Sequence, residues 1–211
     1  MLDYNKTDVV NKVLRLLTAG NREGAGMPRH VDSAQRDHEI RRATLRVVAK
    51  LGVNGVTIRR VAGELGTSTS VITHFTRDKD DLLTRVISAE LDDRRKQITD
   101  LVASAEDPLW AVVNWSVEAD PDGVWPALVS ATAAGVAPHI GQLVRDFDAW
   151  WTDLVSQLVK GRLIDGLSER DAADAIGVVA DGLLLALDSG DWSASHRHLL
   201  ARVLIGPLLS R

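Results

Sequence analysis

Small hydrogen-bonding side chains and cations gather between residues 57 and 79 of this 211-residue chain. A helix that turns 100° per residue places four polar side chains on one side: Thr69, Ser70, Thr73 and His74. Ile72 and Phe75 point to the other side, with Val71 at their edge. Hydroxyl and imidazole groups on a short helix suit the base edges of a DNA major groove, which is wide enough to admit a helix.

Three neighbouring residues add groups that can hold a nucleic-acid backbone. The Thr57 hydroxyl and Lys79 suit phosphates, which fix register, whereas Arg59 can reach a guanine edge or a phosphate. The predicted DNA contacts are therefore Thr57, Arg59, Thr69, Ser70, Val71, Thr73, His74 and Lys79. The alternative is an ordinary helical hairpin whose outward polar side chains are only solvated.

Two short helices joined by a tight turn are needed to position these side chains. An apolar stripe at i, i+3, i+4 and i+7 predicts the first helix; its members are Ile58, Val61, Ala62 and Leu65. Thr57 is placed as its N-cap and Gly66 as the left-handed residue that ends it. Ser68 can cap the second helix, which leaves a turn of about three residues, as in a helix-turn-helix.

The charge of the chain is unevenly distributed. The net charge is −4, yet residues 29–79 carry ten Lys/Arg and five Asp/Glu, whereas residues 80–211 carry eleven and twenty-one. A basic segment on an otherwise acidic chain is typical of a face that binds a polyanion. A solvated basic helix surface would explain the local charge, but not its coincidence with the helix-turn-helix.

Residues from about 33 to 91 resemble the DNA-binding domain of the TetR family of transcriptional regulators. The features that carry the resemblance are the stretch RRATLRVVAKLGVNGVTIRRVAGELGTS, the pair His74-Phe75, and Lys79 followed by Leu82-Leu83. Family members commonly have Gly where this chain has Ser70 and Tyr where it has Thr73, so the base preference does not carry over.

The resemblance implies an all-α fold, in which an N-terminal three-helix helix-turn-helix DNA-binding domain precedes a C-terminal helical ligand-binding and dimerisation domain. It also implies a homodimer on a palindromic double-stranded DNA operator, and a repressor that a small-molecule effector releases. We expect a small apolar or aromatic effector.

The chain is expected to divide into an N-terminal extension (1–28), a DNA-binding domain (29–79) and a ligand-binding and dimerisation domain (80–211). In the extension, a helix is predicted over 7–19 and a flexible linker over 21–26. This helix can pack on the body or on a partner, the segment can reach along DNA as an arm, or the true start is Met27.

Beyond the extension, helical spacing and capping residues predict further helices outside the helix-turn-helix. They span 33–51, 79–102, 107–120, 125–138, 139–163, 168–187 and 193–209. Leu51 is expected on the buried side of its helix. The cations at 94–96 are expected on a solvated face.

Six tryptophans against one tyrosine and two phenylalanines are an unusual balance. Tryptophans in the middle of the chain can line a cavity for an apolar or aromatic molecule, with a few polar groups that fix its orientation. The predicted ligand-binding residues are Trp110, Asn114, Trp115, Trp125, His139 and Trp151. Alternatively, the tryptophans fill the core of a helical body.

The stretch 168–187 has almost no polar side, so its helix must be buried on two sides. We expect one side to meet its own body and the other a second copy of the chain, with Gly177 and Gly182 allowing close approach. The predicted dimer interface combines this helix with the last one: Ala175, Val179, Gly182, Leu183, Leu200, Val203 and Leu204.

Several classes of function find no support in the sequence. The chain has no cysteine, which fits a reducing compartment, and no signal peptide or long apolar run, so we expect a cytoplasmic protein. No catalytic, cofactor-binding or metal-ligand motif occurs, so neither an enzyme nor a cofactor is expected. Two alternatives stay open: a ligand- or partner-binding helical protein without sequence-specific DNA control, and a helical enzyme using acidic residues of the body.

Overall fold

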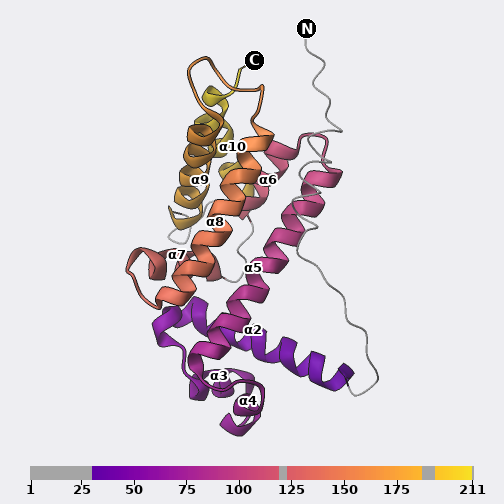
Figure 1. Cartoon of the computed structure of the whole chain (residues 1–211), viewed down its shortest axis with the longest axis vertical. Helices are drawn as coiled ribbons and strands as arrows, with labels where there is room; N and C mark the ends of the chain where they lie inside the picture. The colour runs from indigo at the N-terminus through magenta and orange to yellow at the C-terminus, as the bar shows by residue number, and fades with distance from the viewer. Residues whose placement is uncertain (1–29, 119–122, 187–192, 211) are drawn as a thin grey trace. The chain divides into compact units, whose positions relative to one another are not determined.

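The computed structural model describes residues 30–118, 123–186 and 193–210, whose regular structure is helical apart from one isolated bridge between Leu163 and Leu209. The predicted all-α fold class is confirmed. In chain order the elements are α2 (His30–Gly55), α3 (Ile58–Leu65), α4 (Thr69–Phe75), α5 (Lys79–Ser104), α6 (Pro108–Glu118), α7 (Val124–Ala133), α8 (Pro138–Leu158), α9 (Glu169–Ala186), α10 (Ala194–Ile205) and the 3₁₀ turn η2 (Gly206–Leu208) (Figure 1). The helix and linker predicted over 7–26 lie outside the described residues.

The contacts of the chain group into two compact units. The head unit comprises residues 30–93 and 123–146, and the body unit comprises residues 94–118, 147–186 and 193–210. α5 and α8 each begin in the head unit and end in the body unit. The compact head unit extends beyond the predicted DNA-binding domain (29–79), because it also includes residues 80–93 and 123–146. The predicted border between DNA-binding and ligand-binding functions at residue 79 stays a prediction.

In the head unit, α2 packs against α3 and α7. Its apolar positions recur at helical spacing, and Ile40, Val47 and Val48 are buried as predicted. Gly52, with φ 70° and ψ 171°, breaks the helix. Leu51 was expected in the core but is 53% exposed. The chain turns at Gly52, immediately after Leu51, so that Val53 and Val56 are buried in its place.

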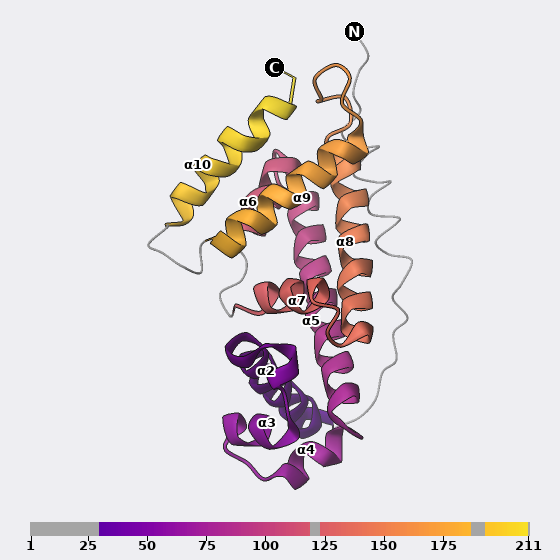
Figure 2. The same cartoon turned by 90° about the vertical axis from the view of Figure 1, so that its left-hand side faces the viewer.

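α7 is the second element that covers α2 (Figure 2). Gly123 starts it from a left-handed conformation, φ 67° and ψ 25°, which glycine adopts without steric cost. A Cβ at position 123 would lie 3.9 Å from the Ala49 side chain. Trp125 and Leu128 are buried, so this face of α7 belongs to the core of the head unit.

In the body unit, α6, α9 and α10 pack against one another (Figure 2). The predicted helix over 139–163 is too long, because α8 ends at Leu158. After Gly161, with φ 73°, the chain pairs with the C-terminal segment: Ser210 N donates to Arg162 O at 2.7 Å and Ile164 N donates to Leu208 O at 3.2 Å.

The prediction of a solvated face at 94–96 is wrong for its first two residues. Arg94 lies three residues after Leu91, on the same side of α5, and is 7% exposed. The Arg95 guanidinium lies 5.7 Å from the ring centroids of Phe147 and Trp150, a cation–π geometry. Long basic side chains can bury their aliphatic stems in this way.

Within the described ranges, no single helix is long and apolar enough to cross a membrane, and α7 and α8 meet that length and composition only as a pair bent by 111°. The same residues contain no group of three or more His, Asp or Glu side chains placed to hold a metal ion.

Candidate nucleic-acid interface

The turn between α3 and α4 is fixed by local hydrogen bonds. Thr57 Oγ1 accepts from Arg60 N at 3.1 Å, so the predicted N-cap of α3 is confirmed. Gly66, with φ 70° and ψ 32°, ends α3 in the left-handed conformation that was predicted. Thr67 N donates back to Ala62 O at 2.9 Å. This bond satisfies a carbonyl of the last helical turn and sets the direction in which the chain enters α4.

Ser68 stands at the N-cap position of α4, but its side chain does not cap the helix. Its hydroxyl instead lies 2.7 Å from the Ser70 hydroxyl, and only its carbonyl accepts, from Val71 N at 3.2 Å. Two adjacent hydroxyl groups that bond each other satisfy part of their hydrogen-bonding capacity without the backbone. The prediction that the Ser68 side chain caps α4 is therefore wrong.

α4 divides into a buried and an open side as its periodicity predicts. Ile72 has no exposed surface, and Val71 and Phe75 are half-buried. Thr69, Ser70, Thr73 and His74 are all exposed. Because Ile72 anchors the helix, the four polar side chains face outward together, and their role in DNA binding stays a prediction.

Most basic side chains of the head unit are held by acceptors within the unit. Arg46 and Lys50 share Glu64 at 2.8 and 2.9 Å, and hydrogen bonds from Lys50 and then Arg46 lower the pKa of that carboxyl. Arg41 binds Glu90 and Asp93 at 2.8 and 2.7 Å. Much of the positive charge counted between residues 29 and 79 is therefore compensated locally.

Three cations of the described head unit make no hydrogen bond or ion pair within it: Arg42, Arg59 and Lys79. Arg59 is exposed near the start of α3, and Lys79 is half-buried at the start of α5. Arg42 was not among the predicted contacts. The sequence could have identified Arg42 as an exposed cation, because it stands two residues after buried Ile40 and so faces the opposite side of α2.

The junction from α4 to α5 is closed by side chains of α5. Thr76 is buried, and its hydroxyl donates to Asp81 Oδ2 at 2.9 Å. The backbone N–H of Arg77 also donates to Asp81 Oδ2, at 3.0 Å. That backbone bond and then the Thr76 hydroxyl lower the pKa of Asp81, so this carboxylate is stabilised in its charged form.

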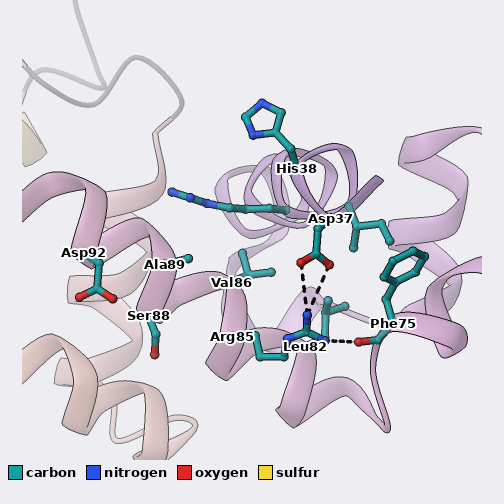
Figure 3. Close-up of a pocket in the computed structure, with 11 residues that line it drawn as sticks. Asp37, His38, Phe75, Leu82, Arg85, Val86, Ser88, Ala89 and Asp92 are labelled. Atoms are coloured by element: carbon teal, nitrogen blue, oxygen red, sulfur yellow. Dashed lines mark hydrogen bonds and ion pairs between the residues drawn. The ribbon is translucent and has the colours of Figure 1, made fainter. Parts of the chain in front are cut away.

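A cavity of about 510 Å³ lies between the first halves of α2 and α5 (Figure 3). It is lined by Asp37, His38, Ile40, Arg41, Phe75, Leu82, Arg85, Val86, Ser88, Ala89 and Asp92. Arg85 points from α5 toward Asp37 of α2 and toward the carbonyl oxygen of Phe75, the last residue of α4. The contact between α5 and the end of α4 was not predicted, because no sequence spacing links these groups.

A row of exposed apolar side chains follows α9 and α10 in the body unit. The exposed large residues there are Val178, Leu185, Leu199, Val203 and Leu204. Of the residues predicted to form a dimer interface, Val203, Leu204 and Gly182 are exposed, whereas Leu183 is buried in its own unit. Ala175, Val179 and Leu200 are half-buried.

Two details of α9 differ from the sequence analysis. Gly177 faces its own chain, since a Cβ there would lie 3.2 Å from the Trp151 ring; only Gly182, which has open space around it, is available to a second copy. Val178 and Leu185 were not predicted, although they stand one residue before the predicted Val179 and two after Leu183. Partial desolvation of the carboxyl group, and then the neighbouring Asp181, raise the pKa of Asp148 on α8 to about 6, although part of the Asp148 side chain is exposed to solvent.

The six predicted ligand-binding residues are divided between the two units. Trp110, Asn114, Trp115 and Trp151 belong to the body unit, whereas Trp125 and His139 belong to the head unit. Trp151 is buried, and Trp110 lies 4.8 Å from the guanidinium of Arg202. The side-chain oxygen of Asn114 is buried and has no hydrogen-bond partner in the described structure. A site built from these residues stays a prediction.

No protein-family model matches this chain. Part of the chain is similar to the HTH-type transcriptional regulator PksA of Bacillus subtilis (strain 168), with 32% identity over 75 residues. These residues are 34% of this chain and 37% of that relative, so the chain spans little more than a third of the length of the curated protein it matches.

Solved structures match most of the chain. A TetR family regulator from Agrobacterium tumefaciens superposes with a TM-score of 0.70 and 17% identity, covering 84% of this chain and 99% of the other. The chain has the TetR fold. A regulator structure from Saccharomonospora viridis in complex with choline gives a TM-score of 0.72 at 20% identity, over 84% of this chain and 100% of the other. The fatty acid degradation regulator FadR from Bacillus halodurans gives a TM-score of 0.67 at 15% identity, over 88% of this chain and 97% of the other.

The TetR fold agrees with the arrangement of the head unit, in which α2, α3 and α4 form the three-helix arrangement that the sequence predicts. DNA binding by these helices stays a prediction. At identities of 15–20%, the likeness shows the fold. The residues that would act in DNA or ligand binding therefore have to be argued from the chemistry of this chain.

Proposed function

We propose that this chain is a sequence-specific DNA-binding transcriptional regulator of the TetR type. The observation that carries the proposal is the open side of α4, where Thr69, Ser70, Thr73 and His74 are exposed together over buried Ile72. Such a helix fits a major groove, whose base edges offer matching donors, acceptors and thymine methyl groups.

Two unpaired cations support this reading of the head unit. Arg59 is exposed without an internal acceptor, so its planar guanidinium is free for the bidentate bond to guanine or for a phosphate. Lys79 and the Thr57 hydroxyl are proposed to hold phosphates and fix the register of α4. The Thr57 hydroxyl already accepts from Arg60 N, and it keeps its own proton to donate to a phosphate oxygen.

The regulator is proposed to act as a homodimer. Val178 and Val203 are 74% and 59% exposed on α9 and α10, which pack against each other, and exposed apolar side chains on neighbouring helices are typical of a protein interface. A two-fold axis through this face would make it self-complementary, and would relate two copies of α4 that engage successive major grooves of a palindromic operator.

The body unit is proposed to bind a small apolar or aromatic effector that releases the repressor from its operator. Trp110 and Trp115 are half-buried and offer aromatic surface, whereas Trp151 is buried. The unpaired oxygen of Asn114 can accept a hydrogen bond from a donor on the ligand. α5 is continuous from the head unit into the body unit. A tenfold loss of operator affinity needs only about 1.4 kcal/mol of differential binding between two states.

The test is fluorescence anisotropy with labelled DNA from upstream of the protein's own gene, against a shuffled fragment of equal length and composition. We expect tighter binding to the native fragment, with affinity that falls as salt rises because phosphate contacts release counterions. The measurement is made at two salt concentrations so that this slope is obtained directly.

Equal and weak binding to both fragments would contradict sequence-specific control by this operator. It would favour the alternative, a helical protein that binds a ligand or a partner without controlling transcription. Quenching of tryptophan fluorescence by candidate ligands then measures ligand binding by the body unit in the absence of DNA.

A further inference from the structure

The orientation of α4 is set by its connections more than by its own packing. The helix has seven residues, and only Ile72 is buried. So short a helix is marginally stable alone, and buried Ile72 with half-buried Val71 and Phe75 gives it few packing contacts of its own. The turn at Gly66 holds the first end of α4. Its second end needs contacts from another element.

Two side chains of α5 hold the second end. Asp81 accepts from the Thr76 hydroxyl at 2.9 Å and from Arg77 N at 3.0 Å, just beyond the last residue of α4. Four residues later, on the same side of α5, Arg85 Nη1 donates to the carbonyl oxygen of Phe75. That carbonyl belongs to the last turn of α4, where carbonyl groups have no partner within the helix and attract cations.

Arg85 also reaches α2. Its Nη2 atom lies 3.3 Å from Asp37 Oδ1, so one guanidinium joins α2, the end of α4 and α5 (Figure 3). The planar fork of an arginine suits this task, because its N–H groups point in fixed directions toward separate acceptors. A lysine has one nitrogen and would serve one acceptor well, but not both with the same geometry.

The space beside Arg85 is open. The cavity of about 510 Å³ between α2 and α5 is lined by Leu82, Val86 and Ala89 as well as by Arg85 and Asp37. Close packing therefore does not fix the distance between α2 and α5 at this level. Two polar bridges join the helices there, Arg41 to Glu90 and Asp93 and Arg85 to Asp37. Of the two, Arg85 also donates to the carbonyl oxygen of Phe75 at the end of α4.

We propose that Arg85 is a positioning residue for DNA recognition. It holds the end of α4 against α2 and α5, and so sets the angle at which Thr73 and His74 meet the bases. Because Arg85 stands on α5, a movement of α5 is passed to α4 through the same contact. This inference rests on the proposed function, and adds to it a residue that makes no contact with a base.

The experiment compares Arg85→Ala, Arg85→Lys and Asp37→Asn with the wild type in the anisotropy assay with native and shuffled DNA. Arg36→Ala is the matched control, since Arg36 pairs with Glu39 on α2 itself at 2.8 Å and bridges no elements. Arg85→Ala and Arg36→Ala each remove one positive charge from the head unit. The difference between their DNA affinities therefore reports the effect of losing the bridge made by Arg85.

We expect Arg85→Ala to bind native DNA about three- to tenfold more weakly than Arg36→Ala, with a smaller preference for native over shuffled DNA. Arg85→Lys should restore part of the affinity, and Asp37→Asn should lose part of it. The slope of log Kd against log salt should equal that of Arg36→Ala. Loss of a direct phosphate contact would instead reduce the slope by about one.

Equal affinities of Arg85→Ala and Arg36→Ala would overturn the proposal, and so would a salt slope reduced by a phosphate contact. A second measurement needs no DNA. Amide hydrogen exchange over 69–75 should be faster in Arg85→Ala than in Arg36→Ala, while exchange over 58–65 is equal in both. If the wild type shows no DNA preference, the proposed function fails, and the exchange rates still decide whether Arg85 holds α4.

Discussion

α4 and the α9–α10 face each have a buried side and an open side, but they differ in what the open side carries. α4 exposes small polar side chains over Ile72, whereas α9 and α10 expose Val178, Leu199 and Val203 over a buried apolar side. A polar open side keeps its hydrogen bonds in water until a partner with matching groups replaces them. An apolar open side is costly in water and gains free energy from any apolar surface that covers it.

The difference between these two faces indicates two kinds of partner. The polar face of α4 suits a hydrated, charged partner and gives specificity through hydrogen bonds, since unmatched donors and acceptors are penalised. The apolar face of α9 and α10 suits a second protein surface and gives affinity through buried area. Changing the polar face should therefore leave dimer formation intact, whereas changing the apolar face should weaken the dimer first and operator binding through it.

The largest effect is expected from a charge placed on the apolar face. Val203→Asp should raise the dissociation constant of the dimer by about 100-fold or more, because an unpaired charge would be buried in the interface. Analytical ultracentrifugation over a range of concentrations measures this. Leu51→Asp is the control, since Leu51 is an exposed leucine of the head unit. A dimer that tolerates Val203→Asp as well as Leu51→Asp would place the interface elsewhere.

A smaller effect is expected when a cation beside the polar face is removed. Arg59→Ala should weaken binding to native DNA by about tenfold and reduce the preference over shuffled DNA, as loss of a base contact does. Arg42→Ala removes another unpaired cation of the head unit and should lower affinity for both fragments alike. The anisotropy assay separates the two, and an unchanged preference in Arg59→Ala would remove Arg59 from base recognition.

The third effect concerns the helix cap that supports the polar face. Thr57→Ala should cost about 1 kcal/mol of unfolding free energy, because Arg60 N loses its acceptor. Ser68→Ala should cost less than about 0.5 kcal/mol, since the Ser68 hydroxyl bonds only the Ser70 hydroxyl. Thermal unfolding compares the pair. Equal losses would mean that position in the sequence, rather than the observed hydrogen bond, determines the cap.

The smallest effect is expected from Asp148, a carboxyl group of α8 that neighbours Asp181 of α9. The pKa of Asp148 is raised to about 6, by partial desolvation and by Asp181, so the folded protein binds a proton that the unfolded chain releases near pH 4. The effect on stability is small because Asp148 is exposed and solvent screens it. Stability from this group is therefore present below about pH 4 and is lost as pH rises through about 6.

Asp148→Asn should accordingly unfold at a higher temperature than the wild type at pH 8, and at the same temperature below about pH 3, where Asp148 is neutral in both states. Asp153→Asn on the same helix, whose carboxyl pairs with Arg170 at 3.1 Å, should show no such gain at pH 8. A gain from Asp148→Asn that is the same at both pH values would exclude titration of this group as the cause.

The comparison also shows which parts of the candidate sites could be predicted. The buried and open sides of α4 follow from a turn of 100° per residue, so Ile72 and the four polar residues were assigned correctly from spacing alone. On α9 the same reasoning identified an apolar helix, but it chose Leu183, which is buried, and omitted Val178, which is exposed. An almost wholly apolar helix has no polar side to mark which direction faces water, so only its neighbours decide.

The sequence by itself determined the features that depend on residues a few positions apart. These include the cap at Thr57, the left-handed end at Gly66, the start of α9 at Ser168, where Asp171 N donates to the Ser168 hydroxyl at 3.1 Å, and the start of α10 at Ser193. Their hydrogen bonds join residues three to five positions apart, and steric limits on the backbone act on single residues, so the local pattern is sufficient.

Only the tertiary structure decided the features that depend on distant segments. α8 ends at Leu158 because residues after Gly161 pair with the C-terminal segment, and Arg95 lies against the rings of Phe147 and Trp150 rather than in water. Arg85 meets the Phe75 carbonyl and Asp37, which stand 10 and 48 positions away. Such contacts have no periodicity along the chain. They exist because folding brings the segments together, and the free energy of each contact is realised only there.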